Sequence, residues 1–221
     1  MSIISPEASA QPVSRQETNT VKPQPREAFG IGVVGCGYWG PNLLRNFHEN
    51  PDCQLVAVFD LNPKRLAWAK AHYPHVRTTF EVEALIASPD IHAIAIATPI
   101  QTHFELAMRC LKAGKHVLVE KPLAHRSDLA RQLIAEAAKR ELVLMVDHTF
   151  IYTPAVRKIR QLVDAGELGE IFYYDSARIN LGLVQADVNV LWDLAVRDLS
   201  IVQYLFPESP QAVSATGMLT A

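Results

Sequence analysis

The sequence has few cysteines, little net charge and no long apolar run. Its three cysteines, Cys36, Cys53 and Cys110, lie far apart, and neither they nor the eight histidines have the spacing of a disulfide framework or a metal site. We therefore expect a reducing cytoplasm as the location and no bound metal. The formal net charge of −2 gives no attraction to nucleic acid or to an anionic membrane. No run approaches the roughly 18 apolar residues that cross a bilayer, so we expect no nucleic-acid or membrane partner.

The first 28 residues also contain little apolar material. They are rich in Pro, Ser, Gln and Glu, and they lack the continuous apolar core of a secretory signal. Such a segment buries too little apolar surface to offset the entropy of ordering it. We therefore predict a disordered arm over residues 1–28.

After this arm, short apolar runs alternate with longer amphipathic segments. The apolar runs, which predict buried strands, are 29–34, 54–60, 93–98, 116–120 and 142–147, with a shorter piece near 76–79. The helix-length segments between them are 41–49, 63–72, 81–88, 102–113 and 127–140. Thr102 with Glu105 predicts a capping box, and Ser127 predicts an N-cap for the last of these helices. The alternation indicates right-handed crossovers and an α/β fold with a Rossmann-type, doubly wound parallel sheet.

A glycine-rich loop separates the first predicted strand from the first predicted helix. It reads Gly35-Cys36-Gly37-Tyr38-Trp39-Gly40, which is the pattern GxGxxG. Gly35 permits a tight turn, Gly37 lets the backbone approach a pyrophosphate, and Gly40 lets the helix pack against the strand. The alternative is a simple glycine turn. The strand before the loop and the helix after it favour a dinucleotide site, to which Tyr38 and Trp39 would also contribute.

Asp60 stands at the end of the second predicted strand, 20 residues past Gly40. A carboxylate at this place accepts hydrogen bonds from the ribose hydroxyls of adenosine and repels a 2′-phosphate. The sequence therefore predicts NAD as the cofactor and makes NADP the weaker alternative, which the nearby Lys64 and Arg65 keep open.

Glu120-Lys121-Pro122 follows the fifth predicted strand. A lysine at the carboxyl end of a parallel strand lies where such sheets bind ligands, although the triplet alone is as often a solvated turn. Together with the GxGxxG loop, Asp60 and Ala97-Thr98-Pro99, it resembles the signature of the glucose–fructose oxidoreductase/inositol dehydrogenase/MocA family. The resemblance covers residues 29 to about 219 and predicts two domains, a dinucleotide-binding domain at 29–148 and an α+β substrate or oligomerisation domain at 149–221.

The second part of the resemblance rests on three segments. Residues 147–157 resemble the link into the second domain, and residues 172–181 are the strand that would follow it. Residues 187–189 and 191–195 resemble members that oxidise nucleotide-linked sugars. The family's second domain is a large open sheet, so we expect 149–221 to form an incomplete version of it. The family is homo-oligomeric, and part of the oligomer surface would lie in the missing strands.

The resemblance implies that a sugar or UDP-sugar hydroxyl is oxidised by hydride transfer to the nicotinamide. Lys121 would bind the hydroxyl and assist its deprotonation, and Glu120 would hold Lys121, with both next to the cofactor. Thr98, Pro99 and His103 would contact the cofactor as well. The candidates for substrate hydrogen bonds are Asn180, Asp187, Asn189 and Asp193, for which a purely structural role is equally open.

Arg197 departs from the family pattern. Members with this segment usually read Trp-Asp-Leu-Ala-x-His-Asp, and their His is the expected proton acceptor. Arginine cannot accept a proton near neutral pH. Arg197 could instead bind an acidic substrate group or pair with Asp193 or Asp198 on the helix, which leaves Lys121 as a base. The main prediction is an NAD-dependent sugar oxidoreductase, and the alternative is a catalytically silent dinucleotide-binding module.

Overall fold

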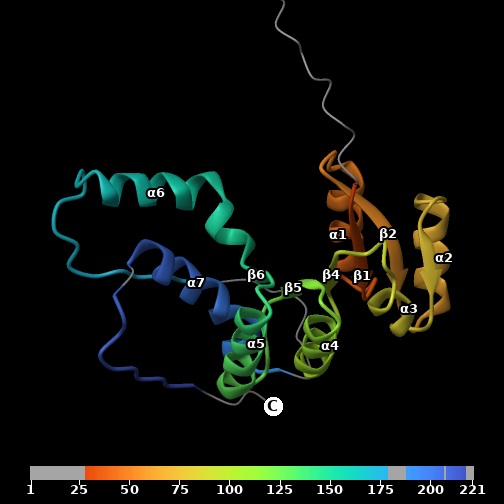
Figure 1. Cartoon of the computed structure of the whole chain (residues 1–221). Helices are drawn as coiled ribbons and strands as arrows, with labels where there is room; N and C mark the ends of the chain where they lie inside the picture. The colour runs from red at the N-terminus through yellow and green to blue at the C-terminus, as the bar shows by residue number, and fades with distance from the viewer. Residues whose placement is uncertain (1–27, 179–187, 207, 218–221) are drawn as a thin grey trace, which may run out of the picture.

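A six-stranded parallel sheet forms the centre of the molecule (Figure 1). The computed structural model describes residues 28–178, 188–206 and 208–217. The strand order is β3-β2-β1-β4-β5-β6, which confirms the predicted doubly wound α/β fold. The strands are β1 (Phe29–Val34), β2 (Cys53–Phe59), β3 (Arg77–Thr79), β4 (Ala93–Ile96), β5 (His116–Glu120) and β6 (Leu144–Asp147). The order reverses between β1 and β4, and ligands bind such sheets at the carboxyl ends of the strands beside this reversal.

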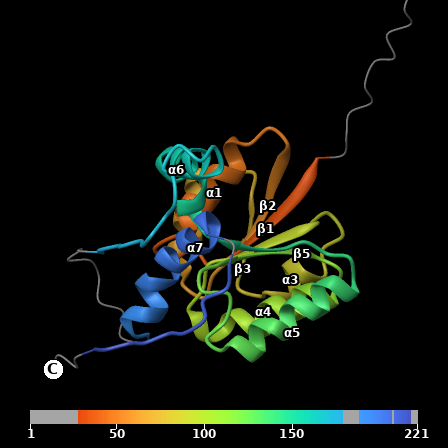
Figure 2. The same ribbon diagram turned by 90° about the vertical axis from the view of Figure 1, so that its left-hand side faces the viewer.

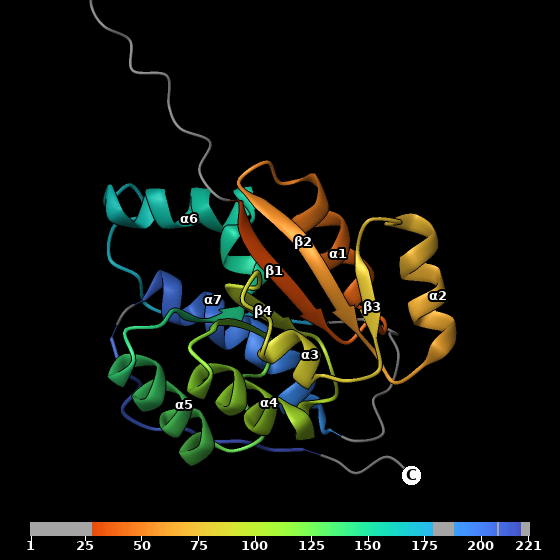
Figure 3. The same cartoon turned by 45° about the vertical axis from the view of Figure 1, so that its right-hand side comes forward.

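Helices cover both faces of the sheet (Figure 3). They are α1 (Gly40–Glu49), α2 (Pro63–His72), α3 (Glu83–Ile86), α4 (Ile100–Lys112) and α5 (Ser127–Lys139). Successive side chains of a strand point to opposite faces. Val33 accordingly packs with Leu44 of α1 and Leu66 of α2. Val34 packs on the other face with residues of α3, α4 and α5. Both faces are therefore apolar, which explains why the strand sequences are continuous apolar runs.

Two predicted helix caps are wrong, and one of the two helices also starts earlier than predicted. Helix α4 begins at Ile100 because the extended Pro99 leads directly into it. Thr102 therefore lies in the first turn, where its hydroxyl bonds to the carbonyl of Pro99 at 2.7 Å and forms no capping box. Helix α5 includes Ser127 as its first residue, and Arg126 occupies the N-cap position without a side-chain cap bond.

The chain after β6 forms a smaller helical region. It contains the 3-10 turn η1 (Thr149–Tyr152), α6 (Pro154–Asp164), the π-helical turn η2 (Leu191–Ala195) and α7 (Val196–Leu205). Figure 2 shows α6 and α7 apart from the sheet helices α4 and α5. Val156, Ile201 and Leu205 form its buried apolar cluster, with Phe150 packed against it. None of the helices in the described ranges is long and apolar enough to cross a membrane.

The strand expected at residues 172–181 is absent over the part that the structure describes. Residues 171–178 are extended but pair with no strand of the described chain. A strand requires a neighbouring strand for its N–H and C=O groups, and the apolar pattern alone does not supply one. Arg178 instead holds the end of this segment to α7 by two hydrogen bonds to Asp198, at 2.8 and 2.9 Å.

Candidate active site

The glycine-rich loop has the shape that a dinucleotide pyrophosphate requires. Gly35 has φ +98°, and a Cβ there would lie 2.6 Å from the carbonyl oxygen of Ala97. A Cβ on Gly40 would lie 2.5 Å from the carbonyl oxygen of Gly35. Above Gly37 the nearest atom belongs to Arg65, 3.7 Å from the Cβ position, so this face of the backbone is open. Trp39 at the N-cap of α1 makes no side-chain cap bond, which leaves the first N–H groups of the helix for phosphate oxygens.

The side chain of Asp60 hydrogen-bonds to this loop. Its side chain is buried, and Oδ2 accepts a hydrogen bond from the backbone N–H of Cys36 at 2.7 Å. Oδ1 accepts one from the N–H of Asn62 at 2.8 Å, and the guanidinium of Arg65 lies 3.5 Å from Oδ2. Asp60 therefore fixes the loop, and the half-exposed Arg65 stands at the outer side of its carboxylate.

A cavity of about 120 Å³ opens where β4 and β5 end. Three parts of the chain contribute to its wall: the turn after β4 with the start of α4, the turn after β5, and the region of η2. The lining residues are Thr98, Pro99, Ile100, His103, Glu120, Lys121, Pro122, Val188, Trp192 and Asp193. The structure thus brings together six residues that the sequence assigned to the site, from segments that are far apart in the chain.

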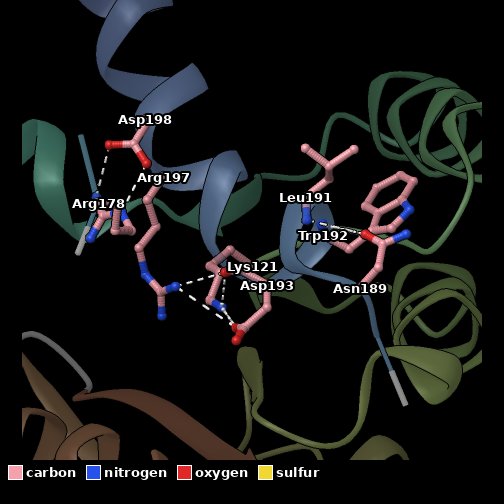
Figure 4. Close-up of polar contacts among 8 residues, drawn as sticks. All are labelled: Lys121, Arg178, Asn189, Leu191, Trp192, Asp193, Arg197 and Asp198. Carbon is pink, nitrogen blue, oxygen red and sulfur yellow. Dashed lines mark hydrogen bonds and ion pairs between the residues drawn. The ribbon is translucent and has the colours of Figure 1, made fainter. Parts of the chain in front are cut away.

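Lys121 is held by Asp193 (Figure 4). Its Nζ donates to the Asp193 carbonyl at 2.9 Å and to the carboxylate Oδ1 at 3.0 Å. Arg197 donates to the same carbonyl at 2.7 Å and lies 3.8 Å from the same Oδ1. Arg197 therefore pairs with Asp193, one of the roles left open by the sequence. The hydrogen bonds of Lys121 go to Asp193 and not to Glu120, which differs from the expectation.

His103 joins the two turns that form the cavity. It is 2% exposed, with Nδ1 at 2.8 Å from the carbonyl oxygen of Pro122 and Nε2 at 2.8 Å from that of Thr98. Burial lowers the pKa of this imidazole. The Lys121–Pro122 peptide bond is cis. Since both ring nitrogens face backbone oxygens, the imidazole holds these turns in place beside the cavity.

Glu120 lies against a carboxylate that the sequence reasoning did not assign to the site. Asp147 ends β6 and is the register partner of Glu120 on β5. Burial, followed by a hydrogen bond with Asp147 and by its charge, raises the pKa of Glu120 to about 8. The indole Nε1 of Trp39 donates to Oδ2 of Asp147 at 3.3 Å. The position of Asp147 at the end of a strand beside β5 is the signal that would have identified it.

Of the remaining candidates, Tyr38 and Asn189 are described by the structure and lie outside the cavity wall. Tyr38 is 83% exposed. The side-chain oxygen of Asn189 accepts from the N–H groups of Leu191 at 3.1 Å and Trp192 at 3.2 Å, so it caps η2 (Figure 4). Asn180 and Asp187 lie outside the described residues. In the described part of the chain, no group of three or more His, Cys, Asp or Glu side chains is arranged to hold a metal ion.

Comparison with known proteins connects this geometry to a family. Residues 29–148 match the sequence model described as an oxidoreductase family with an NAD-binding Rossmann fold. The chain belongs to this family. UDP-N-acetylglucosamine 3-dehydrogenase of Acidithiobacillus ferrooxidans is 35% identical over 85% of this chain and 57% of its own length. Inositol 2-dehydrogenase of Rhizobium meliloti is 29% identical over 84% of this chain and 57% of its own length.

Solved structures of the oxidoreductase family have the same fold. GenD2 from gentamicin A biosynthesis, in complex with NAD, superposes with a TM-score of 0.72 at 26% identity, over 81% of this chain and 54% of GenD2. A putative myo-inositol dehydrogenase from Sinorhizobium meliloti gives 0.73 at 25% identity, over 83% of this chain and 56% of that chain. The chain therefore spans about half the length of the relatives that it matches. The family model is described as NAD-binding, and the open backbone above Gly37 fits the pyrophosphate of such a dinucleotide.

Proposed function

We propose that this chain provides the dinucleotide site and the catalytic lysine of an NAD-dependent oxidoreductase that oxidises a hydroxyl of a sugar or cyclitol. The observation that carries the proposal is the place of Lys121. Its ammonium group lines the cavity at the end of β5 and is fixed by Asp193. The glycine-rich loop and the cavity both lie at the carboxyl ends of the strands of one sheet. In such folds a dinucleotide and a second ligand bind side by side at this edge.

The cofactor would be held by three features of the first domain. The glycine-rich loop and the N-terminus of α1 would bind the pyrophosphate, and Asp60 would bind the adenosine ribose. Thr98 and Pro99 lie in the cavity wall, on the side where the nicotinamide half would extend. Bound NAD supplies the acceptor for the hydride. Asp60 favours NAD over NADP because a 2′-phosphate would approach a carboxylate.

A hydroxylated ring suits the polar groups of the cavity. Lys121 donates hydrogen bonds, and the carboxylate of Asp193 accepts them, so neighbouring hydroxyl groups could bind one to each. Two relatives are named for hydroxylated ring substrates, a UDP-linked sugar and inositol. A UDP-sugar is the first substrate to test, with a free cyclitol as the second.

The alternative is a dinucleotide-binding module without turnover. Arg197 favours it, because the family pattern that this segment resembles has a proton-accepting histidine there, whereas a guanidinium accepts no proton. Arg197 also contacts Asp193 and does not line the cavity.

The experiment is NAD reduction by the purified chain with UDP-N-acetylglucosamine, UDP-glucose and myo-inositol, followed by NADH fluorescence. We expect turnover that Lys121→Ala abolishes while NADH binding persists. Lys112→Ala, at an exposed position of α4, is the matched control and should behave as the wild type. A wild-type chain that binds NADH but oxidises none of the three compounds would establish the silent module instead.

A further inference from the structure

Oxidation of a hydroxyl needs a group that takes up its proton, and most polar groups of the cavity are already engaged. The two ring nitrogens of His103 each face a backbone carbonyl oxygen at 2.8 Å, and the neutral ring donates its single N–H to one of them. Lys121 donates to two oxygens of Asp193, as an ammonium group does. The Asp193 carboxylate accepts a hydrogen bond from Lys121 and lies 3.8 Å from Arg197. The guanidinium of Arg197 accepts no proton.

Glu120 differs from these groups in having an unused oxygen. It lines the same cavity, and its Oε1 is buried and has no hydrogen-bond partner among the described residues. Buried carboxyl oxygens are usually paired, so an unpaired one beside a ligand cavity requires an explanation. The register of β5 and β6 places Asp147 next to it. Two carboxyl groups at neighbouring positions disfavour the ionisation of both, so one of them keeps its proton to a higher pH.

We propose that Glu120 is the proton acceptor of the oxidation and that Asp147 is its positioning residue. The proposal rests on the proposed function, since it concerns the same cavity. The hydroxyl O–H bond breaks and its proton passes to Glu120. The electron pair left on oxygen forms the carbonyl as hydride leaves the same carbon for the nicotinamide. In the reverse direction the protonated Glu120 returns the proton to the carbonyl oxygen.

The charges around Glu120 determine the pH at which it can act. Asp147 on β6 and burial raise its pKa to about 8, whereas Lys121 opposes them. His103 on α4 and Asp193 in η2 are the other ionisable groups of the cavity wall in the described chain. Below this pKa the carboxyl holds its proton and cannot accept another. The rate of oxidation should therefore rise as the pH increases through about 8.

Trp39 extends the carboxyl pair to the glycine-rich loop. Its indole N–H donates a hydrogen bond to Oδ2 of Asp147 at 3.3 Å. The neighbour of Glu120 is thus in contact with the loop that would hold the pyrophosphate.

The first test needs no substrate. At pH 7, infrared spectra of the purified chain should contain the carbonyl band of a protonated carboxylic acid. This band should disappear as the pH rises through about 8. Glu120→Gln should remove this band. Asp147→Asn should move its loss to lower pH, because the neighbouring negative charge is gone. A chain without such a band overturns the proposal whether or not it is active.

The second test is the pH profile of turnover. Glu120→Gln should lower kcat by about 10²–10⁴ and remove the alkaline rise, while NADH binding is kept. Asp147→Asn should shift the rise to lower pH. Glu105→Gln, at an exposed position of α4, is the matched control and should keep the wild-type profile.

The double variant Glu120→Gln/Arg197→His should regain part of the rate, with a rise nearer pH ~6.5, because an imidazole then stands at the place of the family's histidine. Either of two results would overturn the proposal: Glu120→Gln keeps the alkaline rise, or it loses NADH binding as strongly as turnover. If the wild type shows the titrating band but oxidises none of the compounds, the result supports a protonated Glu120 beside Asp147 and contradicts the proposed function.

Discussion

Residues 29–147 and residues 149–217 bury their apolar side chains in different ways. In the first region the sheet is covered on both faces, and Leu44 and Ile96 are fully buried in two large clusters. In the second, only Val156, Ile201 and Leu205 form a buried cluster among the described residues. Aromatic side chains of the extended segment remain exposed there, with Phe172 at 83% and Tyr173 at 85%. The first region has a core of its own, whereas the second depends on a few contacts.

The cavity lies at the junction of these two regions. Lys121 comes from the first and Asp193 from the second, 72 residues later. A rigid sheet thus positions the lysine, and a less densely packed segment supplies the carboxylate that orients it. Stability and catalysis should therefore respond differently to substitutions in the two regions.

The largest expected effect is in the first region, at Gly35. Gly35→Ala places a methyl group 2.6 Å from the Ala97 carbonyl at φ +98°, and such strain and crowding cost about 2–6 kcal/mol. Gly114→Ala is the matched control, since Gly114 also has a positive φ, +79°, but nothing within 4 Å of the added Cβ. It should cost about 1–2 kcal/mol. Urea unfolding measures both, and equal losses would show that backbone strain alone acts at Gly35.

Two leucines compare the cores of the regions directly. Leu44→Ala should lower the free energy of unfolding of the sheet by about 2–5 kcal/mol. Leu205→Ala removes an equally buried side chain from the small cluster. It should increase hydrogen exchange and proteolysis after about residue 150 while residues 29–147 keep their protection. A loss of protection throughout the chain in Leu205→Ala would show that the two regions unfold as one unit.

The same contrast explains what the sequence could predict. The strands of the sheet are local apolar runs with helices on both faces, so their positions in the chain and the fold class followed from the pattern. The strand expected at 172–181 failed because strand formation depends on a partner strand that no local pattern supplies. In the site, Lys121 was identified from its place after β5. Its partner Asp193 and the Glu120–Asp147 contact needed the folded chain.

The hydrogen bonds between the extended segment, residues 171–178, and α7 should depend on pH. Arg178 and Ser176 hydrogen-bond to Asp198, and the Arg178 bond lowers the pKa of that carboxyl. A carboxylate with a lowered folded pKa stabilises the fold above its unfolded value of about 3.9, and the contribution is lost as the pH falls through the folded value. Asp198→Asn should therefore cost the second region about 1–2 kcal/mol at pH 7 and less at a pH below the unfolded value of about 3.9. Hydrogen exchange of α7 at the two pH values measures this difference, and a cost that does not change with pH would assign the effect to packing.

The smallest expected effect is on the choice of dinucleotide. Asp60 disfavours a 2′-phosphate, but Arg65 lies 3.5 Å from its carboxylate and half-exposed, so it offsets part of that repulsion. We expect NADH to bind more tightly than NADPH, and we expect Asp60→Asn to reduce this difference in affinity. Arg65→Ala should weaken NADPH binding by up to about fivefold, the range of an exposed charge pair, and change NADH binding less. Lys64→Ala removes the neighbouring exposed cation and is the control for general charge. Fluorescence titration with both dinucleotides measures these affinities. If Arg65→Ala weakens NADH and NADPH binding equally, Arg65 supports the loop through Asp60 and does not face the ribose.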